Sequence, residues 1–427
     1  MNLLKSKLDN GLSVLIRESR TAPVASFWIW YRVGNLNEHP GITGISHWVE
    51  HMLFKGTERW PQGTRDQAIS REGGYFNGMT WYDFTTYFAT LPADKISLAM
   101  DIEADRMANA RFDPDEFESE RTVIISERQG AENSPLFLLE EEVSSAAFRV
   151  HPYGHETVGH MCDLEAMTRD DLYNYYRAYY TPNNAVVGIA GDFNAGEIER
   201  IVGRYFGQIP EGAPIPPVRA VEPPQRGERR VQVVGGGGTD YLQIAYHVPE
   251  AKHKDFYALT ILNAVLAGGS GFLMGRGQLS NHTSRLYEAL IDGELAVDVS
   301  GTLIPTVAPN LYRFTATARP DRTLAEVEAA LLEQIARVQE HPITPEELEK
   351  AHTQARALFA YSSESITNQA FWLGYSEIFA DYGWFMRYLN NLEQVTAADV
   401  QRVAQTYLQP TNRTVGWYIA EEGGSHG

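Results

Sequence analysis

The chain has 427 residues, more than one ordinary compact core holds and about right for two domains of roughly 200 residues each. Hydrophobic residues make up 43% and charged residues 21%, as in soluble globular proteins, and no apolar run approaches the roughly 20 residues that a membrane-spanning helix needs. The formal net charge of −19, with no compensating cluster of Lys and Arg, argues against a nucleic-acid partner.

The N-terminus and the cysteine content bear on the compartment. Residues 1–7 contain no apolar segment followed by a small-residue cleavage site, so no secretion signal is visible. The single cysteine, Cys162, excludes an intrachain disulfide and fits a reducing compartment. We therefore expect a cytoplasmic protein, or a periplasmic one if a signal peptide has been removed.

A metal-binding pattern follows the first β-rich segment, Phe27–Val33, on a helix predicted to begin near Thr43. This helix carries the run His47-Trp48-Val49-Glu50-His51, the reversed form of a zinc-peptidase motif. Successive helical residues turn by about 100°, so Glu50 lies at about −60° and His51 at about 40° from His47. One face then holds two imidazoles that can bind zinc and a carboxylate that can take a proton from water. The alternative is a pair of surface histidines with an unrelated glutamate.

A third ligand is sought on the next long helical stretch, residues 113–128, because catalytic zinc sites usually offer three protein groups and a water. Two carboxylates interrupt an apolar stripe there, which consists of Phe117, Glu120, Ile124 and Glu127. A carboxylate that faces a core must be paired or bound to metal. The alternatives are that these glutamates pair with Arg121 or Arg128, or lie at a helix edge.

The second half of the chain repeats the first. Adding 228 to the numbers of Thr168, Asp171, Pro182 and Asn184 gives Thr396, Asp399, Pro410 and Asn412 without a gap. Thr168 and Thr396 are predicted helix N-caps. Between the halves, residues 209–227 contain six prolines and no helical or strand period, which is typical of an extended linker.

The repeat predicts the architecture. We expect two related α+β domains, each a mostly antiparallel sheet covered by helices, facing each other as a clamshell. The predicted boundaries are 1–209 for the domain with the metal motif, 210–228 for the linker and 229–427 for the second domain. The Gly-rich stretch 268–277 is predicted to be a loop.

Along most of its length the sequence resembles the inverzincin peptidases, which include pitrilysin, insulin-degrading enzyme and the mitochondrial processing peptidase. The length and two-domain build resemble the processing-peptidase-like bacterial members. The matching segments are Leu8-Asp9-Asn10-Gly11-Leu12, the run from Gly41 to Thr57 around the histidines, Gly73–Thr80, Glu120–Glu127 and His151-Pro152-Tyr153-Gly154.

This resemblance implies a zinc endopeptidase with one Zn²⁺ per chain, held by His47, His51 and Glu127. Glu127 lies 127 − 51 = 76 residues beyond His51, inside the family's Glu-Arg-x-Val-Ile-x-x-Glu pattern. Glu50 is then the catalytic base, and Glu120 is a further acid of the catalytic site. The segment Gly73–Thr80 matches an edge strand to which peptide substrate adds, with Phe76 and Asn77 beside the substrate.

The second half departs from the family pattern. Residues 256–266 hold no His or Glu, and the positions of a substrate-binding Arg and Tyr hold Ile291 and Val297, although Arg285 and Tyr287 remain nearby. We therefore expect a heterodimer with a paralogous subunit that lacks zinc and supplies the Arg/Tyr pair. A homodimer, or another arginine such as Arg313, is the alternative. The competing function is that of a noncatalytic scaffold subunit of a larger complex.

Overall fold

The computed structural model describes residues 3–269 and 282–421, so the predicted loop 268–277 lies outside the described residues from position 270 onward. The chain forms two compact units, and neither is continuous in sequence. The first contains residues up to Gln129 together with His155–Ala220 and Ser363–Phe385. The second contains Gly130–Gly154, Val221–Ser362 and the residues from Met386 onward.

The first unit is built on a six-stranded sheet of order β1-β2-β6-β3-β5-β4, so β4 is an outer strand. Only β2 and β6 run parallel among these neighbours; the other pairs are antiparallel. The strands are β1 (Leu3–Lys7), β2 (Ser13–Glu18), β3 (Val24–Tyr31), β4 (Tyr75–Thr80), β5 (Thr85–Pro92) and β6 (Ala185–Gly191).

Helices cover both faces of this sheet. Residues of β3 are buried almost without interruption, because alternate side chains enter the core on one face and pack under a helix on the other. The helices of the first unit are α1 (Ile45–Phe54), α2 (Thr64–Arg71), α3 (Ser97–Asn109), α4 (Pro114–Glu132), α6 (Met161–Ala166), α7 (Arg169–Tyr179), α8 (Ala195–Phe206) and α12 (Ile366–Phe379).

The second unit repeats this plan with a five-stranded sheet of order β7-β11-β8-β10-β9. Its strands are β7 (Arg229–Gly236), β8 (Tyr241–Val248), β9 (Ala296–Thr302), β10 (Asn310–Ala318) and β11 (Arg413–Glu421). Its helices are α5 (Pro135–Ala147), α9 (Asp255–Leu266), a π-helix (Tyr287–Asp292), α10 (Leu324–Glu340), α11 (Pro345–Ser363) and α14 (Ala397–Tyr407), while α13 (Tyr382–Glu393) runs across the division between the units.

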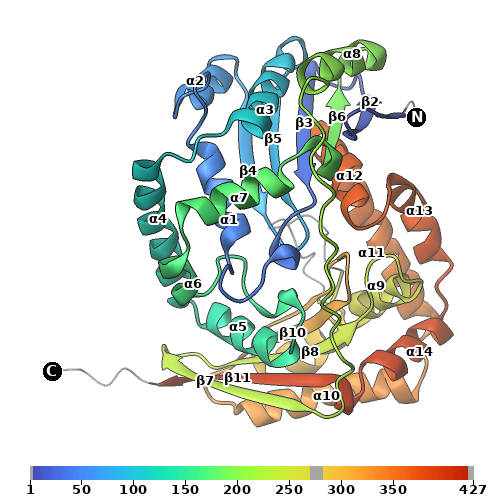
Figure 1. Ribbon diagram of the computed structural model, residues 1–427. Helices are drawn as coiled ribbons and strands as arrows, with labels where there is room; N and C mark the ends of the chain where they lie inside the picture. The colour runs from blue at the N-terminus through green and yellow to red at the C-terminus, as the bar shows by residue number, and fades with distance from the viewer. Residues whose placement is uncertain (1–2, 270–281, 422–427) are drawn as a thin grey trace. The chain divides into compact units, whose positions relative to one another are not determined.

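The two halves of the sequence exchange one helix each, because α12 belongs to the first unit and α5 to the second. In Figure 1 the orange α12 lies along the blue and green strands of the first sheet, and the teal α5 lies on the yellow and red strands of the second. A Cβ added to Gly188 in β6 would lie 2.8 Å from the carbonyl oxygen of Ala370 in α12. One added to Gly416 in β11 would lie 2.3 Å from Val143 in α5. These glycines are 416 − 188 = 228 residues apart, so the repeat extends to the exchanged helices.

The exchange corrects the predicted boundaries 1–209 and 229–427. A helix buried on nearly every side belongs wherever its apolar surface is covered, and α12 is of this kind. Chain order alone does not say which sheet covers it. Other expectations are confirmed: Thr168 and Thr396 both cap helices in capping boxes, and residues 210–228 form no helix or strand. Both sheets are mostly antiparallel, as predicted.

Candidate metal centre

Helix α1 presents the histidines, and its N-terminus is anchored before the first ligand. Gly44 precedes the helix with φ 85°, where a Cβ would lie 2.4 Å from the carbonyl oxygen of Val158, so only glycine fits. The buried carboxylate of Glu38 accepts hydrogen bonds from the Gly44 and Ser46 amides at 2.8 and 2.9 Å. An anion here satisfies free N–H groups and complements the helix dipole. His47 therefore projects from a fixed helical turn.

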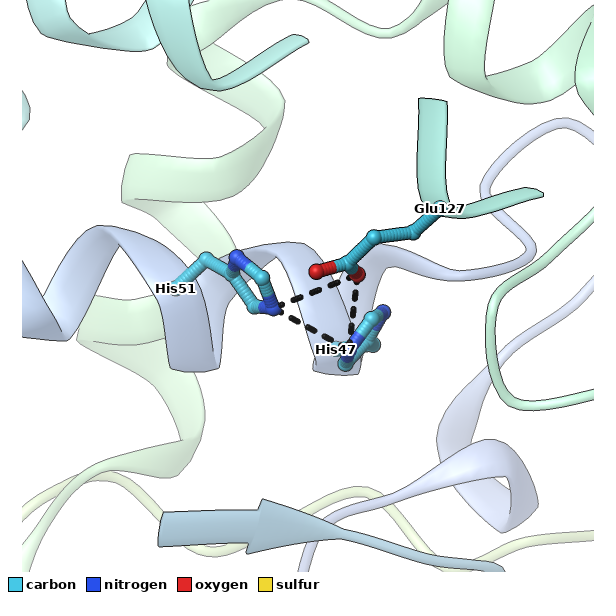
Figure 2. A group of neighbouring side chains, drawn as sticks. All are labelled: His47, His51 and Glu127. Atoms are coloured by element: carbon cyan, nitrogen blue, oxygen red, sulfur yellow. Dashed lines mark hydrogen bonds and ion pairs between the residues drawn. The ribbon is translucent and has the colours of Figure 1, made fainter. Parts of the chain in front are cut away.

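The imidazole rings of His47 and His51 in α1 approach each other through their Nε2 atoms. The Nε2 atoms of His47 and His51 lie 3.2 Å apart, as the i, i+4 spacing on one helix face predicts. Figure 2 shows both rings directed toward the Glu127 carboxylate, which comes from a different helix, α4. The Glu127 Oε2 atom lies 3.8 Å from Nε2 of His47 and 3.6 Å from Nε2 of His51.

Glu127 is not buried as the apolar stripe predicted. Phe117, Glu120 and Ile124 are buried along α4, whereas the Glu127 side chain is 45% exposed. The next residue, Arg128, is buried in its place. The first three residues of the predicted stripe therefore face the core, and the fourth, Glu127, does not. Glu120 is the buried carboxylate that must be paired, whereas Glu127 is identified by its distance to the two imidazoles.

The three ligand atoms fit zinc. Zinc bonds to imidazole nitrogen and carboxylate oxygen are about 2.1 Å long, and a tetrahedron with such bonds has edges of about 3.4 Å. The observed separations of 3.2, 3.6 and 3.8 Å surround this value. Two nitrogens and one oxygen leave a fourth position for water or substrate, as catalytic zinc sites require. Among the described residues, this is the one group of His, Cys, Asp or Glu side chains close enough to share a metal.

Glu120 orients the His51 ring through its Nδ1 atom. Its Oε1 atom lies 2.8 Å from Nδ1 of His51, and its Oε2 atom pairs with the ammonium group of Lys55. A hydrogen bond from Nδ1–H to a carboxylate leaves Nε2 unprotonated and turned toward the metal position. Burial alone would raise the pKa of Glu120, but the bonds from His51 and Lys55 outweigh it and lower that pKa. Glu120 is thus held as an anion.

Replacing Glu120 by Gln should weaken zinc binding about tenfold, because outer partners of metal-binding histidines contribute about 10- to 100-fold. The amide oxygen still accepts a bond but lacks the charge that raises the basicity of His51. Competitive titration with a zinc chelator measures the effect. Glu118→Gln is the matched control, since Glu118 lies on the same helix and pairs with Arg121 instead. Equal affinity of the Glu120 variant and the wild type would remove Glu120 from this role.

The two histidines differ in how strongly protons compete with zinc for their ring nitrogens. Burial and the neighbouring His51 lower the pKa of His47 to about 3, so this ring is neutral near pH 7. For His51, burial lowers the pKa, but the hydrogen bond to Glu120 and the charges of Glu127 and Glu50 outweigh burial and raise it. Zinc binding must therefore displace a proton from His51 as the pH falls through its raised pKa, and none from His47 until near pH 3.

Zinc affinity should accordingly fall by at most about tenfold per pH unit once the pH falls below the raised pKa of His51, because one proton competes. Calorimetric titrations in buffers of different ionisation enthalpy count the protons released. We expect up to one proton per zinc across this range. Release of two protons below about pH 6, where a metal-bound water with a pKa of about 7 keeps its proton, would show that His47 is also protonated in the metal-free chain.

Glu50 lies between the two ligands in α1 and is only 7% exposed. The Thr80 hydroxyl, at the end of β4, donates a 2.7 Å hydrogen bond to its Oε2 atom. Burial raises the pKa of Glu50 above its usual range. A buried carboxylate with a raised pKa beside a metal position is suited to take and return a proton. The Thr80 contact was not predicted; its only signal in the sequence is its place at the end of the matching edge-strand segment.

The edge strand β4 places Phe76 and Asn77 on opposite faces. The Phe76 ring faces the core side, where the Arg65 guanidinium lies 5.1 Å from its centroid and 4.8 Å from that of Phe54 in α1. The Phe76 side chain is thus partly buried on the same face of β4 as α1. Asn77 is exposed, and its Oδ1 accepts a 2.9 Å hydrogen bond from the Gly78 amide.

The residues at the positions of the family's Arg/Tyr pair, and the arginines considered as substitutes for it, lie in the second unit. Ile291 falls in the π-helix, and Val297 is exposed on β9. Arg285 is paired with Glu347 at 2.6 Å. Arg313 is buried, donates to the Ser144 hydroxyl at 3.0 Å and lies 3.7 Å from a Glu140 carboxylate oxygen. Both arginines are held by partners within their own unit.

The sequence is similar to members of a peptidase family. Residues 13–160 match the family described as "Insulinase (Peptidase family M16)", and residues 166–355 match the "Peptidase M16 inactive domain". The chain is 28% identical over 420 residues to the zinc protease PqqE of Helicobacter pylori, covering 95% of this chain and 90% of that protein. It is 27% identical over 423 residues to an uncharacterised zinc protease of Mycobacterium leprae, with 96% and 90% covered.

Solved structures show the same fold. The crystal structure of a protease from Helicobacter pylori matches with a TM-score of 0.92 at 27% identity, over 98% of this chain and 99% of that chain. The structure of a peptidase M16 inactive domain from Pseudomonas fluorescens matches with a TM-score of 0.86 at 17% identity, over 99% of both chains, and shares the fold. Within the part of the chain that the structure describes, no helix is both long and apolar enough to cross a membrane.

Proposed function

Because the chain belongs to the inverzincin family of M16 peptidases, we propose that it is a zinc-dependent endopeptidase that hydrolyses peptides or unfolded polypeptides. The observation that carries this proposal is the site itself. Three ligand atoms from His47, His51 and Glu127 lie 3.2–3.8 Å apart, and the buried carboxylate of Glu50 lies on the same helix as the two histidines.

Each residue of the site has its own role in the proposed reaction. His47, His51 and Glu127 would hold zinc, and a zinc ion bound there would supply Lewis-acid chemistry, polarising the scissile carbonyl and acidifying a water. Glu50 takes a proton from the attacking water and gives it to the amine nitrogen as the C–N bond breaks. Thr80 keeps the Glu50 carboxylate in one orientation through its 2.7 Å hydrogen bond. Glu120 fixes the His51 ring in the tautomer that offers Nε2.

Substrate binds, in this proposal, as a strand added to β4. An outer strand offers unpaired main-chain groups, and added strands pair with them. Main-chain pairing is independent of side-chain identity, which suits varied peptides. The Glu50–Thr80 contact joins this strand to the catalytic base, so a peptide on β4 passes the site of proton transfer.

A paralogous partner is the second part of the proposal. The positions of the family's Arg/Tyr pair hold Ile291 and Val297. Arg285, close by in sequence, is held by Glu347, and Arg313 is held by Ser144. We therefore place the oxyanion-binding pair on a second subunit that need not bind zinc. A homodimer is the alternative arrangement. A noncatalytic scaffold role is disfavoured because all four groups needed to bind zinc and move a proton are present.

The test is a digest of an unfolded peptide by the zinc-loaded chain, alone and mixed with a paralogous subunit. We expect cuts at internal bonds, read by mass spectrometry, that need the mixture and stop when a chelator removes zinc. Full activity of the isolated chain would reject the partner requirement only. No cleavage by the zinc-loaded chain, alone or mixed, would reject the peptidase.

A further inference from the structure

Three aromatic rings form a ladder across the first sheet up to its open edge. The ladder consists of Trp28 in β3, Phe88 in β5 and Tyr75 in β4. Trp28 and Phe88 are direct cross-strand partners whose ring centroids lie 4.0 Å apart at 7°. The Phe88 and Tyr75 centroids lie 5.6 Å apart at 64°. Edge-to-face and stacked pairs at such distances are favourable beyond their buried area.

Exposure increases along the ladder toward the edge of the sheet. Trp28 is 3% exposed, Phe88 is 8% and Tyr75 is 60%. Because β4 is the outer strand, the next place in the ladder falls on whatever strand pairs with β4. A residue on that strand directly opposite Tyr75 would lie about 5 Å away between Cβ atoms and could extend the aromatic series.

The sequence of β4 itself contains none of the usual features that protect an outer strand from such pairing. Proteins commonly protect outer strands with charged residues, Pro or bulges, and β4 reads Tyr75-Phe76-Asn77-Gly78-Met79-Thr80, with neither charge nor Pro. Its register with β5 runs without a shift from Tyr75↔Thr90 to Thr80↔Thr85. The strand is thus regular and uncharged, as a strand that accepts a partner must be.

The same strand ends at the catalytic base. Thr80 holds Glu50, and Tyr75 lies five positions earlier, about 17 Å along the strand at about 3.3 Å per residue. A peptide paired along β4 would meet Tyr75 several residues away from the Glu50 end. Tyr75 also lies on the opposite face of the strand from Thr80, so it would contact side chains that point away from the base.

We propose that Tyr75 is a specificity-determining residue that selects extended peptides with an aromatic side chain directly opposite it on the added strand. The inference rests on the proposed function, because it assigns a substrate class to the same edge. Aromatic cross-strand pairing should strengthen binding about three- to tenfold over alanine at that one position. Positions whose side chains fall on the other face should show no aromatic advantage through Tyr75.

The experiment measures binding apart from cleavage. The zinc-loaded full chain carrying Glu50→Gln is titrated by fluorescence anisotropy with labelled peptides in which one Phe is moved through an otherwise Ala/Thr host. We expect one position with a three- to tenfold lower Kd. Tyr75→Ser in the same background should abolish that advantage, whereas Tyr75→Phe should keep it. Val234→Ser is the control, since Val234 is a 49% exposed residue on β7, an outer strand of the other sheet.

The outcomes separate this inference from the proposed function. Equal Kd values for every peptide, no measurable binding, or an advantage that survives Tyr75→Ser would each overturn the role of Tyr75. Peptide cleavage by the chain with Glu50 intact is scored in a parallel digest, and its failure would count against the peptidase. Circular dichroism of the Tyr75 variants verifies the fold, and the Phe variant keeps the test valid if Ser disturbs the strand.

Discussion

Glu50→Gln should lower peptide hydrolysis by about 10³-fold while zinc remains bound, since a positioned general base contributes about 10²- to 10⁴-fold. Glutamine keeps the size of the side chain, and its amide oxygen can still accept the Thr80 hydrogen bond of 2.7 Å. It cannot take a proton from water. The loss should therefore appear in kcat, with KM and zinc affinity nearly unchanged.

The measurement combines initial rates of peptide cleavage with zinc analysis of the same sample. Glu58→Gln is the matched control, because Glu58 is an exposed acid shortly after the same helix. Retained hydrolysis in the Glu50 variant would reject the role of Glu50 as the base. Loss of zinc together with activity would show instead that Glu50 supports the metal site.

Glu127→Gln should lower zinc affinity by about 10²-fold or more. Zinc-finger sites with four protein ligands bind zinc with roughly 10–16 kcal/mol. Each ligand there contributes about 3 kcal/mol on average, which corresponds to about 10²-fold in affinity. The neutral amide also removes the negative charge that lies 3.6 and 3.8 Å from the two imidazoles. Hydrolysis at limiting zinc should fall in proportion, and excess zinc should restore part of it.

Chelator competition measures the Glu127 effect, with Glu118→Gln as the control on the same helix. The partial rescue by zinc distinguishes this variant from Glu50→Gln, which zinc cannot restore. An affinity equal to that of the wild type would mean that the third ligand lies elsewhere.

The spacing of residues in the sequence predicts the group His47, Glu50 and His51, but it does not predict the residues that contact this group from other segments. Helical geometry places His47, Glu50 and His51 on one face without any structure. The helical stripe also identified Glu120 as a buried acid, which the structure bears out at 4% exposure. Glu127 needed the family resemblance, because the same stripe predicted burial for a residue that is 45% exposed.

Contacts that join distant segments of the chain could not be predicted from the sequence. Lys55 pairs with Glu120, and Glu38 anchors the start of α1 while accepting a 2.7 Å hydrogen bond from His155. Polar residues of these types are abundant, and nothing local distinguishes those that meet in space. Thr80 is the same case, since a threonine at a strand end has many uses.

The fold shows the same division between local and long-range information. The caps at Thr168 and Thr396 depend on residues three positions away, so the sequence predicts them well. The exchange of α5 and α12 depends on which sheet covers a helix. Gly188 and Gly416 mark the close approaches, but as single glycines in strands they do not identify the helix that packs there.

Metal analysis of the purified chain decides whether His47, His51 and Glu127 form a zinc site. Mass spectrometry of the metal content, together with a calorimetric titration of the metal-free chain, gives stoichiometry and affinity. We predict one zinc per chain, lost in a chain that carries His47→Ala, His51→Ala and Glu127→Ala together. A wild-type chain that takes up no zinc, or a triple variant that binds zinc as well as the wild type, would rule out a zinc site at these residues.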